Sequence, residues 1–243
     1  MSLEQVADGV WHGTGTDVGW VLARDGSDLT LVDGGYPGDV DALEASIRAV
    51  GCRPEDVRAV LLTHAHVDHL GGPAELARRY GTPVLAHPDE VPLVRGERSE
   101  QASTADVVVR CWHPRVATWA VRIARAGGRS HPTVPDAQAW AGDRPLDLPG
   151  GPVPVPCVGH TSGHAAYHLP AAGVLVTGDA VVTAHPVTGR RGPHLLPDFF
   201  STDPAMVRRT VCRLAEVPAD VVVPGHGPVW HGSPADLVAA LDA

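Results

Sequence analysis

The fold of this protein is decided by one stretch of its sequence, Thr63-His64-Ala65-His66-Val67-Asp68-His69. The stretch follows an apolar run at 57–62 and precedes two glycines, which predicts a buried strand that delivers a loop. We expect the next helix to cover residues 74–80. Three imidazoles and a carboxylate this close together would repel one another and compete for water unless a cation held them. Because neutral imidazole and carboxylate are the ligands that zinc and similar ions prefer, the stretch predicts a metal site rather than a solvated turn.

Three further candidate ligands each follow a predicted strand and lie beside a glycine. They belong to the triplets Gly159-His160-Thr161, Gly178-Asp179-Ala180 and Gly225-His226-Gly227. Glycine allows the backbone to turn sharply and to approach an ion closely. Since the same placement recurs at three separate strand ends, we expect His160, Asp179 and His226 to complete the site.

Together these motifs resemble those of the metallo-β-lactamase-fold hydrolases, and in particular the glyoxalase II-like branch. The resemblance covers nearly the whole chain and rests on His-x-His-x-Asp-His, Gly-His-Thr, Gly-Asp and the final Gly-His. The patterns of strands and helices by themselves predict an α/β protein. The resemblance implies more: an αββα four-layer sandwich in a single domain, residues 1–243, with a partly helical insertion at about 90–148.

The resemblance also implies a role for each ligand in a site that holds two divalent ions. The first ion is held by His64, His66 and His160. The second is held by Asp68, His69 and His226, and Asp179 bridges the two. In such sites a hydroxide between the ions attacks the substrate, and Asp68 orients the attacking oxygen or moves its proton. Zinc is the first expectation, with iron or manganese as alternatives, because His/Asp sites accept all three.

The activity implied by the resemblance is hydrolysis of a carboxylic ester, a thioester or a lactone. Two departures bear on the substrate. The chain has no lysine, whereas glutathione-binding members carry basic and tyrosine residues near their C-terminus. Lactonases place a tyrosine shortly after the bridging aspartate, where this chain has Ala180-Val181-Val182. The alternatives are a β-lactam hydrolase and a noncatalytic metal-stabilised binding module, and the complete ligand set favours a hydrolase.

The composition of the chain indicates which kinds of binding partner and which cellular compartment to expect. The formal charge of −9 disfavours binding to nucleic acid or to an anionic membrane surface. No apolar run approaches the ~20 residues that span a bilayer. The first residues lack a signal-peptide pattern and the four cysteines are widely spaced, so we expect a cytoplasmic protein with reduced thiols and a small-molecule substrate. No residue pattern indicates an oligomeric state.

The expected insertion contains a helix at 114–126 with two interpretations. Its arginines Arg115, Arg122 and Arg125, with Arg129 just beyond, gather on one face. In the first interpretation the helix is a lid over the metals, and its arginines meet an anionic group of the substrate. In the second it is a peripheral helix with a solvated basic face.

Four other polar residues also have two interpretations. Asp33, at a strand end, either accepts hydrogen bonds from the histidine stretch or stabilises its own turn. His164 either supports the ligands or has a structural role. His185 and His194 either line the pocket or lie on the surface, and we favour the surface.

Overall fold

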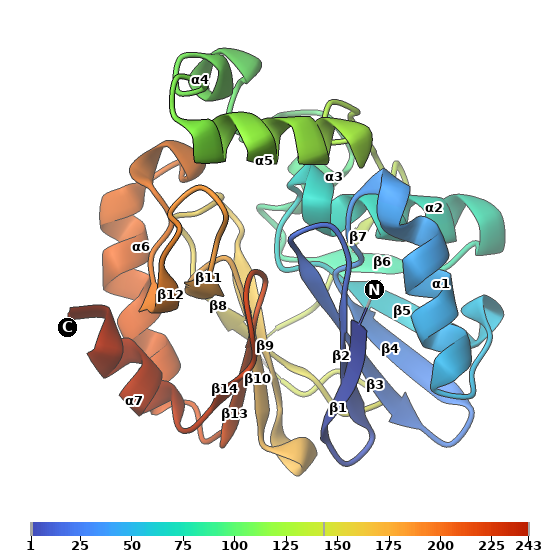
Figure 1. Ribbon diagram of the computed structural model, residues 1–243. Helices are drawn as coiled ribbons and strands as arrows, with labels where there is room; N and C mark the ends of the chain where they lie inside the picture. The colour runs from blue at the N-terminus through green and yellow to red at the C-terminus, as the bar shows by residue number, and fades with distance from the viewer. Residues whose placement is uncertain (1, 143, 243) are drawn as a thin grey trace.

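Two β-sheets face each other at the centre of the molecule (Figure 1). The computed structural model describes residues 2–142 and 144–242, so Met1, Asp143 and Ala243 lie outside the described part of the expected domain and insertion. The first sheet has seven strands in the order β1 to β7, and the second has five in the order β14-β13-β10-β9-β8. Strands β11 and β12 form a separate two-stranded sheet.

Both large sheets are mixed, with antiparallel and parallel pairs of strands. The first sheet comprises β1 (Ser2–Ala7), β2 (Val10–Thr14), β3 (Gly19–Asp25), β4 (Asp28–Val32), β5 (Val57–Leu61), β6 (Val84–Ala86) and β7 (Gln138–Ala139). The other strands are β8 (Val153–Pro156), β9 (Ala165–Leu169), β10 (Val174–Gly178), β11 (Val182–Ala184), β12 (Arg191–His194), β13 (Val221–Pro224) and β14 (Trp230–His231). Strands β4 and β5 are parallel, as are β10 and β13. Each parallel pair therefore ends at the same edge of its sheet.

Helices cover the outer face of each sheet and complete the expected αββα sandwich (Figure 1). Helices α1 (Val40–Ala49) and α2 (Val67–Tyr80) pack on the first sheet. Helices α6 (Pro204–Thr210) and α7 (Pro234–Ala239) pack on the second. The 3-10 turns are η1 (Pro37–Asp39), η2 (Pro54–Asp56), η3 (Pro170–Ala172), η4 (Asp198–Phe200), η5 (Val211–Glu216) and η6 (Ala240–Asp242).

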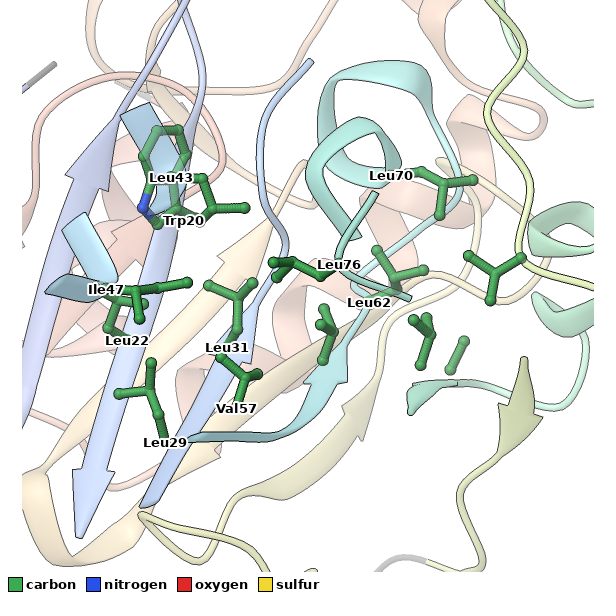
Figure 2. Packing of buried hydrophobic residues seen from close by; sticks show 14 of the residues in the cluster. Trp20, Leu22, Leu29, Leu31, Leu43, Ile47, Val57, Leu62, Leu70 and Leu76 are labelled. Carbon is green, nitrogen blue, oxygen red and sulfur yellow. The ribbon is translucent and has the colours of Figure 1, made fainter. Parts of the chain in front are cut away.

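Strand β3 shows why the layers form. Trp20 and Leu22 pack with Ile47 of α1 on the outer side of the first sheet (Figure 2). Val21 and Ala23 of the same strand belong to the apolar cluster between the two sheets. Successive side chains of a strand point to opposite faces, so a strand that is apolar at consecutive positions must be covered on both.

Helix α2 begins at Val67, so the expectation that it starts near residue 74 is wrong. Asp68 and His69 therefore lie in its first turn rather than in a preceding loop. The pair Gly71-Gly72 weakens a helix on propensity alone. Here it lets α2 approach another part of the chain, because a Cβ on Gly72 would collide with the carbonyl oxygen of Gly34.

Residues 90–148 are partly helical, as expected, and hold α3 (Val91–Val94), α4 (Thr104–Val108) and α5 (Pro114–Arg125). The segment returns through β7, which extends the first sheet beside β6. Helix α5 lies across one end of both sheets (Figure 1). Within the described residues, none of the helices combines the length and the apolar character that a bilayer crossing requires.

Candidate metal centre

Strand ends from both sheets deliver the predicted ligands to one place. Strand β5 leads into the histidine stretch, and β8, β10 and β13 lead to His160, Asp179 and His226. Gly225 N donates a hydrogen bond to Gly178 O (2.9 Å), which holds the last two loops together. The expected convergence of residues far apart in the sequence is therefore present in the structure.

Three imidazoles form the first donor group. One ring nitrogen from each of His64, His66 and His160 lies within 4.8 Å of the other two. His160 Nε2 and His66 Nδ1 are 3.1 Å apart. All three side chains are buried, which limits their access to bulk solvent.

Asp68, His69 and His226 form the second donor group. Asp68 Oδ2 lies 3.5 Å from His226 Nε2 and 4.0 Å from His69 Nε2. The side chain of Asp68 is 16% exposed, whereas that of His69 is fully buried. Asp68 is therefore the member of this group that reaches the open side of the site.

Asp179 lies between the two donor groups. Its Oδ2 is 3.5 Å from His160 Nε2 in the first group and 3.2 Å from His226 Nε2 in the second. Its Oδ1 is 3.4 Å from His69 Nε2. One carboxylate thus contacts ligand nitrogens from both groups.

Three buried atoms of the cluster lack a hydrogen-bond partner among the described residues. They are His64 Nε2, His69 Nε2 and Asp179 Oδ1. Each unpaired buried polar group costs about 1–3 kcal/mol, and more if it is charged. Cations between the donor groups would satisfy all three, so these His and Asp residues are placed to bind divalent metal ions.

The titration of the histidines agrees with this assignment. Burial, together with the neighbouring imidazoles, holds the pKa of His64 and of His160 well below the usual range. Both rings therefore keep a lone pair available for a cation. Burial also opposes the charging of His226, but the carboxylate of Asp179 outweighs it and raises the pKa of His226 to about 9. Metal binding at that ring would release the proton.

Hydrogen bonds to the far side of the rings fix their orientation. Asp33 Oδ2 lies 2.8 Å from His69 Nδ1 and accepts a hydrogen bond from Thr63 Oγ1 (2.7 Å). Asp33 thus contacts the histidine stretch, as the first of its two interpretations required. His226 Nδ1 lies 2.6 Å from the carbonyl oxygen of Asp17. Such contacts orient a ligand and increase its basicity.

His164 supports the bridging residue from behind. Its Nε2 accepts a hydrogen bond from Asp179 N (3.1 Å), and its Nδ1 lies 3.2 Å from Cys157 Sγ. Burial lowers the pKa of His164 to about 3, so the ring stays neutral. The structure gives His164 a role in positioning the Asp179 backbone and does not bring it into either donor group.

Glu90 is a site residue that the sequence analysis missed. Its carboxylate accepts hydrogen bonds from Ala65 N (2.7 Å), Thr161 Oγ1 (2.7 Å) and Gly163 N (3.0 Å). It therefore connects the histidine stretch to the loop that carries His160. The only signal available in the sequence was its position shortly after the strand at 83–86.

His185 and His194 are buried, so the favoured interpretation of both as surface histidines is wrong. The ring of His185 packs edge-on against that of His226, with 4.9 Å between centroids. Trp119 of α5 and Phe200 pack around His185. Burial occurs because α5 and η4 cover this ring, which sequence spacing could not indicate.

Helix α5 also contacts the other wall of the site. Ile123 packs with Val18, Tyr36 and Val67, and Val67 precedes Asp68. Arg122 forms an ion pair with Asp17. Helix α5 therefore touches residues next to Asp68 and His226, two members of the second donor group, which is the placement that the lid interpretation needs.

Comparison with known proteins identifies relatives of the whole sandwich. The model of the family described as metallo-beta-lactamase superfamily matches residues 13–226. The chain is 25% identical over 208 residues to the probable metallo-hydrolase YflN of Bacillus subtilis, which covers 82% of this chain and 75% of that protein. It is 31% identical over 204 residues to the hydroxyacylglutathione hydrolase of Halorhodospira halophila, covering 83% of this chain but only 58% of the relative.

Solved structures share the fold at low sequence identity. A metallo-beta-lactamase family protein from Thermus thermophilus superposes with a TM-score of 0.66 at 23% identity, covering 97% of this chain and 80% of that one. The metallo-beta-lactamase SMB-1 has a TM-score of 0.66 at 20% identity, covering 93% of this chain and 80% of that one. At these identities the similarity establishes the architecture alone.

Proposed function

This chain belongs to the metallo-beta-lactamase superfamily, and on that premise we propose that it is a dinuclear metal-dependent hydrolase of a carboxylic ester, thioester or lactone. The observation that carries the proposal is the position of Asp179. One buried carboxylate lies within 3.5 Å of His160 in one donor group and of His226 in the other. A site for a single ion would not need a carboxylate shared in this way.

The proposed assignment of ligands follows the two donor groups. His64, His66 and His160 would hold one ion, and Asp68, His69 and His226 would hold the other. Asp179, which contacts a nitrogen of each set, would be shared between them. When bound, divalent ions supply Lewis-acid chemistry and make water more acidic. Zinc suits this donor set, with iron and manganese as the alternatives.

Residues on the open side of the site, Asp68 and a group of aromatic side chains, would act on the substrate. Asp68 is partly exposed where the other members of its group are buried, so we assign it the catalytic task of orienting the attacking oxygen and carrying its proton to the leaving group. Trp119 and Phe200, packed around His185, form an apolar wall beside His226. That wall limits the access of bulk water to the reacting groups.

A thioester is the substrate class we place first, because several relatives of this chain are hydroxyacylglutathione hydrolases. The chain spans little more than half the length of those relatives. It also lacks lysine altogether. The proposal therefore stays with the bond that is cleaved and does not extend to glutathione as the leaving group.

Metal-quantified protein assayed against thioesters, aryl esters, lactones and β-lactams tests the proposal. We expect hydrolysis of thioesters or esters, its loss on chelation and its return on addition of zinc. Asp179→Ala should lower activity by more than the roughly 100-fold typical of losing a group that only orients a ligand. Preference for β-lactams would replace the proposal by the β-lactamase alternative. Bound metal without any hydrolysis would indicate the binding module, and full activity after verified metal removal would refute the metal requirement.

A further inference from the structure

A cavity of about 630 Å³ opens beside the second donor group. Its walls include residues of β1, the β2–β3 connection, the start of α5, and the segment between β11 and β12. Gly227 and Pro228, which directly follow His226, also line it. The volume is in the range of pockets that hold small-molecule ligands.

Three arginines line this cavity: Arg115 from α5, and Arg190 and Arg191 from the β11–β12 turn. Among the described residues, no carboxylate oxygen lies within 4.0 Å of their guanidinium groups. Two carboxylates also lie on the wall: Asp17 forms an ion pair with Arg122, and Glu4, whose side chain is 58% exposed, lies 3.3 Å from His12. The three arginines outnumber these two acidic groups. Three cations that share one cavity repel one another, and an anion that binds among them relieves the repulsion.

The guanidinium group of Arg115 packs closely against the turn between β11 and β12. It lies on the backbone of Gly189, where a Cβ would collide with Nη1. Gly189 has a φ of +62°, a conformation that side chains other than glycine rarely adopt. The turn between β11 and β12 therefore accommodates this arginine, and a guanidinium held in place loses less entropy on binding an anion.

The cavity is close to the expected metals. His185 lines it, and the His185 ring packs against His226 with 4.9 Å between centroids. A ligand in the cavity would therefore lie one side chain away from the second donor group. A substrate could place its charged end among the arginines and its acyl group at the metals.

We propose that this cavity binds a phosphate group carried by the substrate, through Arg115, Arg190 and Arg191. The inference rests on the proposed hydrolase function and deepens it: the substrate is an acyl compound, first a thioester, whose leaving group bears a phosphate. A phosphate carries about −1.5 to −2 charges and several acceptor oxygens, which suits three guanidinium groups better than a single carboxylate does. Of the four arginines expected to meet an anion, Arg115 alone lines the cavity. Arg122 forms an ion pair with Asp17 instead.

A matched pair of substrates tests the inference: an S-acyl phosphopantetheine and the S-acyl pantetheine that differs from it only by the phosphate. We expect wild-type protein to prefer the phosphorylated thioester, mainly through a lower KM. Arg115→Ala, Arg190→Ala and Arg191→Ala should each weaken that preference by about 10-fold, the size of one charge-assisted contact. Their rates with S-acyl pantetheine should stay close to that of wild type. Arg209→Ala, which removes an exposed arginine of α6, is the matched control.

Direct binding separates this inference from the proposed function. Phosphopantetheine binding to metal-loaded protein is measured by calorimetry, with pantetheine as the uncharged probe. The carboxylate-bearing probe is 4′-O-carboxymethyl pantetheine, a non-hydrolysable ether with its charge at the same end as the phosphate. Weaker binding of phosphopantetheine to the arginine variants supports the cavity even if no thioester is hydrolysed, in which case only the proposed function fails. Equal binding of all three probes, or equal binding by wild type and the triple arginine variant, overturns the inference. Arg115→Lys keeps the positive charge but loses the paired N–H donors of the guanidinium group. A folded Arg115→Lys variant should therefore retain partial binding of phosphopantetheine.

Discussion

Arg122 of α5 donates a hydrogen bond from Nε to Asp17 Oδ2 at 2.8 Å, across 105 positions of sequence. The carbonyl oxygen of the same aspartate lies 2.6 Å from His226 Nδ1. Asp17 also has a positive φ of 61°. A single residue in a constrained conformation thus connects the helix above the site to one of its ligands.

Loss of the Arg122–Asp17 pair distinguishes the two interpretations of α5. If α5 is a lid, Arg122→Ala should raise KM roughly threefold to tenfold, because the closed arrangement would be less populated. Stability should fall by less than about 1 kcal/mol, since the pair is partly exposed. Steady-state kinetics and chemical denaturation measure the two effects, with Arg125→Ala on the same helix as control. An unchanged KM would mean that α5 is a fixed peripheral helix.

Asp33 should affect metal affinity rather than folding. Asp33→Asn keeps the size of the side chain and tolerates the positive φ of 60° at this position. It removes the charge that lies 2.8 Å from His69 Nδ1. We expect metal affinity to fall by about 10- to 100-fold, measured by competition with a chelator. Asp198→Asn, on the surface, should have no effect, and an equal loss in both variants would contradict the assignment.

Glu90 should make the stability of the metal-free protein depend on pH. Burial raises its pKa to about 7, although its three hydrogen-bond donors oppose the shift. Because this pKa lies above the ordinary value of 4.5, protonation favours the folded state. The contribution is complete below about pH 4.5 and is lost as pH rises to about 7, on the order of 3 kcal/mol in total.

Comparison with Glu90→Gln isolates this contribution from the histidines, which titrate in both proteins. The free energy of unfolding of wild type minus that of the variant should decrease between about pH 4.5 and 7, and should be constant above that range. Urea denaturation at a series of pH values provides the measurement. A difference that does not change with pH would show that burial does not raise the pKa of Glu90 in the folded protein.

Gly72 should tolerate no side chain. A Cβ there would collide with Gly34 O, so Gly72→Ala should destabilise the protein by more than about 2 kcal/mol. Gly81, at the end of the same helix, has a φ of +69°, and no atom lies within 4 Å of the place that a Cβ would occupy. Gly81→Ala should therefore cost only about 1 kcal/mol of backbone strain. Similar losses in both variants, measured by urea denaturation, would contradict the close approach of α2 to Gly34.

The chemistry of the metal centre and the class of fold could be predicted because both depend on neighbouring residues. An apolar run indicates a strand, and a glycine beside a polar residue indicates a strand end, so His160, Asp179 and His226 could be proposed as ligands. His64 could be proposed because it lies in a cluster of four donors after such a run. The sandwich itself required the family resemblance, because apolar runs do not specify which sheets face each other. The paired donor groups then followed from where these strands end.

Tertiary packing alone decided the rest. Helix α2, which begins at Val67, approaches Gly34 closely at Gly72, and the contact between His226 and Asp17 joins positions 209 residues apart. The burial of His185 and the position of Arg115 in the same cavity as Arg190 depend likewise on where α5 lies. Local propensity and periodicity are set by residues a few positions apart, whereas these contacts exist only after distant segments have packed. The sequence by itself determined which groups could bind a metal, and the packed structure determined what surrounds them.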